Sequence, residues 1–196
     1  MAFLKTLSGG LADDMALKGD GVVLRYPTME DFEAWARLRG ESRDFLVPWE
    51  PAWTRDELTR TAYRRRLRRY ARDIRDNEAH PFFIFKEQGG ALVGGVTLSN
   101  IRRGVARACA LGYWVGASHR RQGYVSSAVA TLLPFVFGTL QLHRLEAACL
   151  PENAASEGLL RKLGFTQEGY AREYLKINGV WRDHLLFAMV KGDLKG

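Results

Sequence analysis

The stretch LGYWVGASHRRQGYVSSAVATLLPFVFGTL, residues 111–140, decides the fold. It begins as a short apolar run that ends at Val115 and changes at Gly116 into a polar, basic loop. A helical pattern follows, because apolar residues then recur at the spacing of one helix face. Those residues are Val125, Ala128, Val129, Leu132 and Val136. The order predicts a strand, a loop and a helix.

The loop carries the residues RRQG at positions 120–123. A helix that begins directly after a glycine-containing loop points several unpaired backbone N–H groups at one spot, where an anion such as a phosphate binds. Arg120 and Arg121 add forked donors, which suit a diphosphate better than a carboxylate. The same residues fit a plain strand-to-helix turn with solvated arginines. These residues alone leave both interpretations open.

Turn residues and periodicity predict the other elements. Residues 1–20 are punctuated by glycine and aperiodic, so we expect an irregular lead-in before a single domain over 21–196. Helices are predicted to begin at Thr28, at a Thr54–Glu57 capping box and at Asn153. Strands are predicted over 21–26, 82–86, 91–98, 106–115, 143–150, 167–175 and 184–190. We expect a mixed α/β fold, with a central, mostly antiparallel sheet of about seven strands and helices on both faces.

Composition bounds the function classes. The chain has 196 residues, is 46% hydrophobic and carries a formal charge of +7, which favours contact with nucleic acid, a ribosomal surface or a phosphate-rich cofactor. Cys109 and Cys149 lie in apolar runs, as expected of reduced core thiols in the cytoplasm. No signal peptide or membrane span is expected. The four histidines lack ligand spacing, so no metal is expected.

The helix predicted over 54–76 has an unusual polar face. Like charges at i, i+4 cost a few tenths of a kcal/mol each, so the face opposes helix stability. It suggests an acidic or RNA-bearing partner, and the alternative is a solvated face in an arginine-rich protein. The basic residues are Arg60, Arg64, Arg65, Arg66, Arg68, Arg69, Arg72 and Arg75.

The loop at 120–125 resembles the acetyl-CoA loop of the GCN5-related N-acetyltransferases, which has the form Gln/Arg-x-x-Gly-x-Gly/Ala. Val125 departs from that pattern, because the family has a small residue there. The resemblance extends over nearly the whole chain and includes Asn153-x-x-Ser156 followed by Leu-Gly-Phe at 163–165. Two further segments look most like the ribosomal-protein-alanine acetyltransferases: FLVPWEP at 45–51 and REYLKINGVWRDHLLFAMV at 172–190.

The resemblance implies acetyl-CoA as co-substrate, without a metal. It implies that the fourth and fifth predicted strands splay just before the loop, so that freed backbone groups hold the pantetheine arm. The amide N–H of Val115 would then donate to the oxyanion. The cofactor-binding residues implied in this way are Tyr113, Trp114, Val115, Arg120, Arg121, Gln122, Gly123, Tyr124, Val125, Ser126 and Asn153.

The resemblance also assigns the acid–base roles. Glu173 would be the general base, which has a modest task because an α-amine has a pKa near 7.7–8.0. The alternative for Glu173 is a strand-edge carboxylate paired with Arg172 or Arg182. Ser156 would give the leaving thiolate its proton, or else is a second capping hydroxyl. Tyr170 and Tyr174 are reserve acids. Neither cysteine has a neighbouring histidine or helix N-terminus, so we expect direct attack without a covalent intermediate.

Aromatic and acidic residues in the two segments that resemble the ribosomal-protein-alanine acetyltransferases, 45–51 and 172–190, predict the acceptor contacts. The segment 45–51 is rich in proline, so we expect an irregular loop that lines the site, or else a loop whose Trp49 only fills the edge of the core. The predicted acceptor residues are Trp49, Glu50, Tyr174 and Trp181.

Three functional hypotheses follow. The first is acetylation of a protein N-terminal α-amine, on a ribosomal protein. The second is acetylation of a small amine such as an aminoglycoside or polyamine, whose pockets are usually lined with carboxylates. The third, of another class, is a non-catalytic ribosome- or RNA-binding module that uses the arginine-rich helix.

Overall fold

Eight strands form a single sheet in the part of the chain that the computed structural model describes, residues 15–194. The order across the sheet is β1-β2-β3-β4-β5-β6-β8-β7, and all neighbours are antiparallel except β5 and β6. The strands are β1 (Ala16–Gly19), β2 (Val22–Arg25), β3 (His80–Lys86), β4 (Leu92–Arg102), β5 (Ala108–Val115), β6 (Arg144–Cys149), β7 (Thr166–Ile177) and β8 (Val180–Val190).

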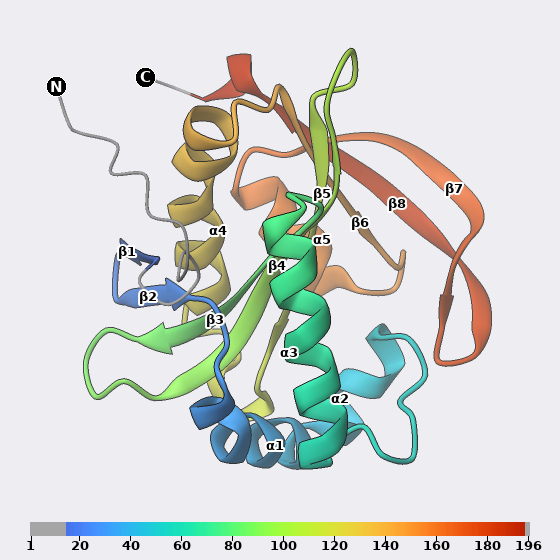
Figure 1. Cartoon of the computed structure of the whole chain (residues 1–196). Coiled ribbons are helices and arrows are strands. Elements are labelled where there is room, and N and C mark those ends of the chain that lie inside the picture. Colours follow the sequence, from blue (N-terminus) through green and yellow to red (C-terminus); the bar gives the residue numbers. More distant parts are fainter. Residues whose placement is uncertain (1–14, 195–196) are drawn as a thin grey trace, which may run out of the picture.

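Helices cover both faces of this sheet (Figure 1). The α-helices are α1 (Phe32–Glu41), α2 (Arg43–Leu46), α3 (Arg60–Arg75), α4 (Tyr124–Pro134) and α5 (Ala154–Lys162). Within the described residues, four 3₁₀ turns span Met29–Asp31, Val47–Trp49, Ala117–His119 and Lys191–Asp193, and α4 continues as a π-helical turn over Phe135–Thr139. The mixed α/β prediction is confirmed.

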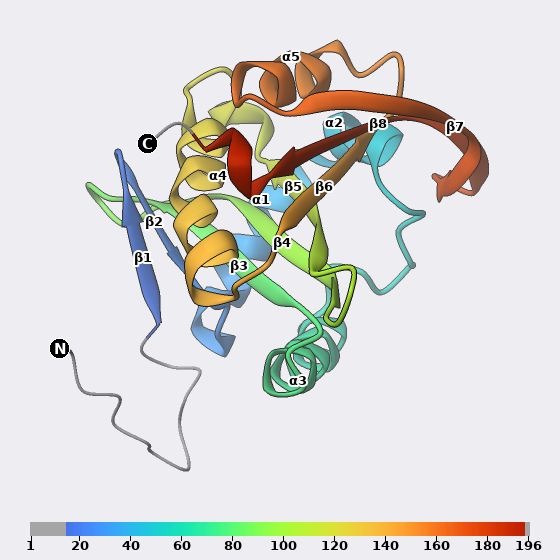
Figure 2. The ribbon, with the colours of Figure 1, turned by 90° about the horizontal axis from the view of Figure 1, so that it is seen from above.

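The core is divided by the sheet into two clusters. The larger cluster lies between the sheet and α4, where Ala128, Val129 and Leu132 are fully buried. The smaller cluster lies under α1 and α3 on the opposite face and includes Trp35 and Tyr63 (Figure 2). The helical spacing of the apolar residues in 125–136 therefore predicted the buried face of α4 correctly.

Three sequence predictions need correction. The irregular lead-in does not extend to residue 20, because Ala16–Gly19 pairs with β2 and adds an eighth strand; residues 1–14 lie outside the described part. The helix predicted from Thr54 begins at Arg60, capped by the Thr59 hydroxyl, which accepts the Ala62 N–H at 3.2 Å. The Thr54 hydroxyl instead donates to Asp56 at 2.7 Å.

The third correction concerns 45–51, which is more regular than expected. Arg43–Leu46 forms α2 and Val47–Trp49 forms a 3₁₀ turn. Pro48 is compatible with this geometry because it lies in the first turn, where its missing N–H has no helical partner to lose.

Buried His80 makes stability depend on pH. Its Nδ1 lies 2.7 Å from the Tyr26 hydroxyl and its Nε2 lies 3.2 Å from Asn77 Oδ1, so the neutral ring satisfies both contacts. Burial, with a smaller contribution from Arg103, lowers the pKa of His80 to about 4. In the unfolded chain this pKa returns to about 6.5. Between pH 4 and pH 6.5 the unfolded chain therefore carries a proton on His80 that the folded protein lacks.

The contribution of neutral His80 to the free energy of unfolding is therefore fully present well above pH 6.5 and is lost as the pH falls from 6.5 towards 4. Between pH 7.5 and pH 5 we expect a loss of about 2 kcal/mol in the free energy of unfolding, measured by urea titration. An NMR titration of the His80 ring should give a midpoint near pH 4. A midpoint near 6.5 would contradict this account.

Candidate active site

The sheet opens between β5 and β6. Their parallel pairing runs from Ala108↔Arg144 to Leu111↔Ala147 and stops there, although β5 continues to Val115. The predicted splay of the fourth and fifth strands is thus present, at β5 and β6 in the observed numbering. A gap of this kind exposes backbone groups that a complete sheet would pair.

The alternation of hydrogen bonds shows which groups face the gap. The Gly116 N–H donates to the Val93 carbonyl at 2.9 Å, so Gly116 faces β4. In an antiparallel ladder alternate residues face the same neighbour, so Trp114 also faces β4, while Tyr113 and Val115 face β6. Their main-chain groups lie beyond the end of the β5–β6 ladder. This geometry supports Val115 as oxyanion donor, which stays a prediction.

Helix α4 begins directly after this strand and loop. Its N-cap, Gly123, has φ +84° and no side chain with which to cap the helix. The Ser127 N–H makes the first helical bond, to the Gly123 carbonyl at 2.9 Å. The N–H groups of residues 124–126 precede that bond and have no helical partner. Val125 packs against the main core cluster, which accounts for a larger residue at this position.

Two side chains of the loop hold its shape. The Gln122 amide donates to the Ser118 carbonyl at 2.9 Å, and Arg120 Nε donates to the Ala117 carbonyl at 3.0 Å. The Arg120 guanidinium also lies over the Phe45 ring, 4.7 Å from its centroid. The loop is therefore ordered by its own side chains, and the alternative of a merely solvated turn fits Arg121 better than Arg120.

Helix α1 fixes the base of the loop. The Ala117 N–H donates to the hydroxyl of Ser42, which is buried, at 2.8 Å. A Cβ atom at Gly116 would lie 2.3 Å from Leu38 Cδ1, so a larger residue would force the buried Leu38 side chain of α1 to move. The loop that precedes α4 is thus anchored to the core by α1 and Ser42.

Ser156 and Tyr113 lie together near the gap. Burial raises the pKa of Tyr113 to about 12, and the neighbouring Ser156 side chain opposes that rise. Asn153 Oδ1 accepts the Ser156 N–H at 3.1 Å, which confirms Asn153 as the N-cap of α5. Sequence reasoning assigned Tyr113 only a backbone role and missed this side-chain contact. Asn153 as a pantetheine ligand stays a prediction.

The pKa of Tyr113 limits what this pair can do. Complete proton transfer from a phenol of pKa about 12 to a thiolate, whose thiol has a reference pKa near 8.5, is unfavourable. The pair is suited to hydrogen-bonding a developing thiolate.

We expect Ser156→Ala to lower kcat about tenfold, the equivalent of one charge-assisted hydrogen bond, with the Kd of CoA unchanged. Stopped-flow release of the thiol checks this, and an unchanged kcat would remove Ser156 from the mechanism.

Glu173 occupies a bulge in β7. The register of β7 against β8 shifts between Ala171 and Leu175, and Glu173 has φ +48°, an unusual conformation for a residue with a side chain. Its N–H donates to Asp183 Oδ1 at 2.8 Å. Strained backbone of this kind is common at functional sites.

The ion pair proposed as the alternative role of Glu173 is absent from the described residues. Arg182 pairs with Glu152, and Arg172 makes no ion pair within residues 15–194. The Glu173 carboxylate is exposed and faces a cavity of about 370 Å³. The cavity is lined by Pro151, Glu152, Tyr170, Glu173, Trp181, Arg182 and Asp183.

Asp183 is a residue that sequence reasoning missed. It also accepts the Tyr170 hydroxyl at 2.5 Å. This bond, together with the Glu173 N–H, lowers the pKa of Asp183, and the same contact raises that of Tyr170. Tyr170 is therefore committed to Asp183, which makes it a poor reserve acid. The signal was non-local, because residues 170 and 183 meet only through hairpin pairing.

The predicted acceptor residues lie on two adjacent segments. The Asn178 N–H at the β7–β8 turn donates to the Glu50 carbonyl at 2.8 Å. Trp181 is 57% exposed in the same hairpin, and Tyr174 packs edge-on against His184. Trp49 is half-buried. The structure brings these segments together, and their contact with an acceptor stays a prediction.

Glu50 has a structural task that the sequence did not reveal. Its carboxylate accepts two bonds from buried Arg39, at 3.1 and 2.6 Å, and one from Trp53 Nε1 at 2.8 Å. Arg39 also lies 5.0 Å from the Trp114 ring centroid. Glu50 therefore links α1, the 47–53 segment and β5, and its carboxylate is already occupied.

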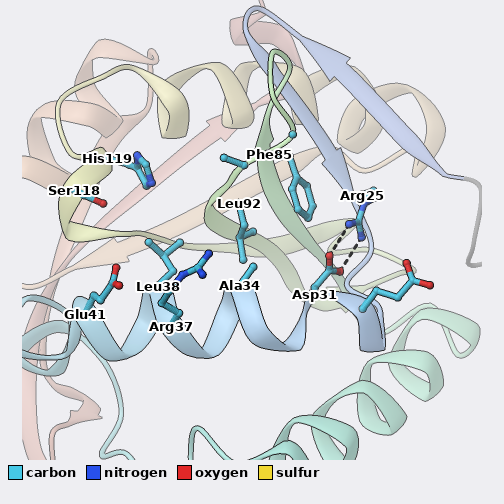
Figure 3. A pocket seen from close by; sticks show the side chains of 13 residues that line it. Arg25, Asp31, Ala34, Arg37, Leu38, Glu41, Phe85, Leu92, Ser118 and His119 are labelled. Atoms are coloured by element: carbon cyan, nitrogen blue, oxygen red, sulfur yellow. Dashed lines mark hydrogen bonds and ion pairs between the residues drawn. The ribbon is translucent and has the colours of Figure 1, made fainter.

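A second cavity, of about 350 Å³, lies between α1, the β3–β4 turn and the loop that follows β5 (Figure 3). An Arg25–Asp31 pair, with bonds of 2.8 and 2.6 Å, closes one end, and His119 lies at the other. None of the predicted site residues lines it.

Three further features of residues 15–194 concern metal ligands, cysteines and membrane-spanning helices. Within residues 15–194 no cluster of three or more His, Cys, Asp or Glu side chains is arranged to hold a metal ion. Cys109 and Cys149 are buried free thiols, and burial raises their pKa values to about 12 and about 11, which disfavours thiolates. In this same part of the chain, every helix is too short or too polar to cross a bilayer.

The fold and site define a GNAT acetyltransferase: residues 22–166 match the family model described as "Acetyltransferase (GNAT) domain", and the chain belongs to this family. It is an N-acetyltransferase of the GNAT type. The [Ribosomal protein uS5]-alanine N-acetyltransferase of Escherichia coli (strain K12) is 34% identical over 179 residues, 90% of this chain and 91% of that protein. A probable N-acetyltransferase, YjcK of Bacillus subtilis (strain 168), is 34% identical over 177 residues, 90% of this chain and 98% of that protein.

Solved structures agree. Mycobacterium smegmatis RimJ, in complex with CoA-disulfide, superposes with a TM-score of 0.85 at 34% identity and covers 93% of this chain and 88% of its own. The ribosomal-protein-S5-alanine acetyltransferase of Vibrio fischeri has a TM-score of 0.84 at 30% identity, with coverages of 93% and 100%. Neighbours of this fold are therefore known with CoA bound.

Proposed function

We propose that the protein transfers an acetyl group from acetyl-CoA to the N-terminal α-amine of a ribosomal protein. The observation that carries the proposal is the opening of the sheet beside α4. There the backbone of Tyr113 and Val115 and the uncapped N–H groups of residues 124–126 lie at the end of one strand and the start of the next helix. Relatives that match over nine-tenths of the chain are named for acetylating a ribosomal-protein alanine.

Different residues perform the separate steps of the proposed reaction. Acetyl-CoA supplies an acyl group activated as a thioester. The first turn of α4, with Arg120 and Arg121, binds the diphosphate. Glu173 accepts the proton of the attacking amine, and the Val115 N–H donates to the oxyanion that develops on the carbonyl. Ser156 and Tyr113 hydrogen-bond to the departing sulfur, and no covalent enzyme intermediate forms.

One observation bears on the alternative of a small polyamine as acceptor. The cavity at Glu173 carries three carboxylates, those of Glu152, Glu173 and Asp183. Two of them are already engaged, however, because Glu152 pairs with Arg182 and Asp183 accepts from Tyr170. A single uncommitted carboxylate fits one amine better than a polycation.

The deciding experiment compares acceptors directly. A peptide that carries the N-terminal sequence of the same organism's uS5 protein, with a free α-amine and an internal lysine, should gain one acetyl group on its first residue. Spermidine and kanamycin serve as competing acceptors in the same assay. Acetylation of spermidine with the higher kcat/KM, or of the internal lysine, would overturn the proposal. N-terminal proteomics of cells with and without the protein would then identify the natural acceptor.

A further inference from the structure

Helix α3 carries an extended basic surface that the acetyltransferase site does not use. Of its 16 residues eight are arginine, one is acidic and none is lysine. Tyr63, Leu67 and Ile74 pack against the core. The exposed arginines form what we call the arginine face: Arg60, Arg64, Arg65, Arg68, Arg69, Arg72 and Arg75.

The arginine face is only partly neutralised. Arg60, Arg65, Arg72 and Arg75 each have an acidic neighbour, at 3.1–3.8 Å, in exposed pairs that contribute little. Within residues 15–194, Arg64, Arg68 and Arg69 have no acidic partner within 4.0 Å. The middle of the helix therefore presents uncompensated positive charge.

The geometry of this charge is regular. Arg64, Arg68 and Arg72 follow one another at i, i+4 on a helix that rises about 5.4 Å per turn. Such neighbours repel by a few tenths of a kcal/mol each. An ordered row of guanidinium groups is matched by a row of anions, and the guanidinium fork suits phosphate oxygens.

The same surface lacks what a protein partner would need. Protein interfaces depend on buried aromatic or aliphatic anchors. The exposed large hydrophobic residues of the described chain lie elsewhere, and none of them is on α3. Charge without apolar anchors favours a nucleic-acid backbone over an acidic protein.

We propose that the arginine face of α3 binds the phosphate backbone of structured RNA. This inference does not depend on the proposed acceptor. It gives the enzyme a means to dock on a ribosomal particle without blocking its catalytic hairpin, because α3 and the β7–β8 hairpin lie apart in both views (Figures 1 and 2). Backbone contacts of this kind are largely independent of base sequence.

The test uses a fluorescently labelled 20-base-pair RNA hairpin and anisotropy at several salt concentrations. The variant Arg64→Gln/Arg68→Gln/Arg72→Gln removes three exposed charges. A matched control, Lys18→Gln/Lys162→Gln/Lys191→Gln, removes three exposed charges from other surfaces. Thermal melting verifies that both variants fold.

We expect the arginine variant to lose at least tenfold in RNA affinity at 100 mM salt and to lower the salt slope by about 2–3, since each phosphate contact contributes about 0.7–0.9. The RNA affinity of the control should stay within about twofold of the wild type, because its three lysines lie on other surfaces and are not expected to contact the phosphates. Equal losses in both variants, or tighter binding of a poly-glutamate peptide than of RNA, would overturn the proposal. Acetylation of a short peptide should be unchanged in the arginine variant, so this result is separate from the acceptor hypothesis.

Discussion

Replacing Glu173 with glutamine should lower kcat/KM for a peptide acceptor about 100-fold at pH 7, the low end for loss of a general base. Glutamine keeps the size of the side chain but cannot accept the proton of the amine. The deficit should shrink towards pH 9, because an α-amine with a pKa near 7.7–8.0 is then already neutral. Initial rates measured across this pH range check both the size and the shape of the effect.

The matched control for this variant is Glu168→Gln. Glu168 is also an exposed carboxylate on β7, and it pairs with Arg144 away from the cavity. Its removal should leave the pH–rate profile unchanged, and neither variant should alter the Kd of CoA. A Glu173→Gln enzyme within about threefold of wild type at pH 7 is far below the expected effect of a base and would assign the role to another group.

Replacing Gly123 with aspartate should weaken CoA binding at least 100-fold, about 2.7 kcal/mol. The substitution places a carboxylate at the N-terminus of α4, where the diphosphate is expected. Space is not the obstacle, because a Cβ atom at Gly123 would meet no atom within 4 Å. The left-handed φ of +84° strains any residue with a side chain, so we expect a lower melting temperature for this variant, and CoA binding is compared with that of a second variant that shares the strain. Calorimetric titration with CoA measures the effect.

Gly123→Asn separates charge from backbone conformation. Asparagine has nearly the same shape, carries no charge and tolerates the left-handed region that φ +84° requires. Asparagine lacks the negative charge that repels the diphosphate, so this variant should bind CoA within about tenfold of wild type. The remaining loss comes from the added side chain. Equal affinities for the aspartate and asparagine variants would show that no anion binds beside residue 123.

The sequence predicted most of the fold where the signals were local. The change from an apolar run to a loop and then to helical spacing across 111–140 identified β5 and α4. Asn153 marked the start of α5, and this helix ends just before Gly164, which adopts φ +89°. The errors arose where two local signals competed, as with the caps at Thr54 and Thr59, or where only tertiary pairing decides, as for the short strand Ala16–Gly19.

The candidate site was less predictable because its contacts are non-local. The bonds from Tyr170 and Glu173 to Asp183 depend on the register of a bulged hairpin. The contact between Tyr113 and Ser156 joins β5 to α5 across the gap. Spacing in the sequence carries no information about either arrangement. The resemblance to a family identified Tyr113, Ser156 and Glu173 as candidates, and the structure showed which residues lie next to them.

The most direct test of the account is a crystal structure of this protein with CoA. We expect diphosphate oxygens within about 2.7–3.2 Å of main-chain nitrogens in residues 122–126, with the pantetheine arm beside Tyr113 and Val115 in the gap between β5 and β6. The account would be contradicted if the protein's own atoms occupied those nitrogens while CoA bound elsewhere, for example in the cavity beside Arg25.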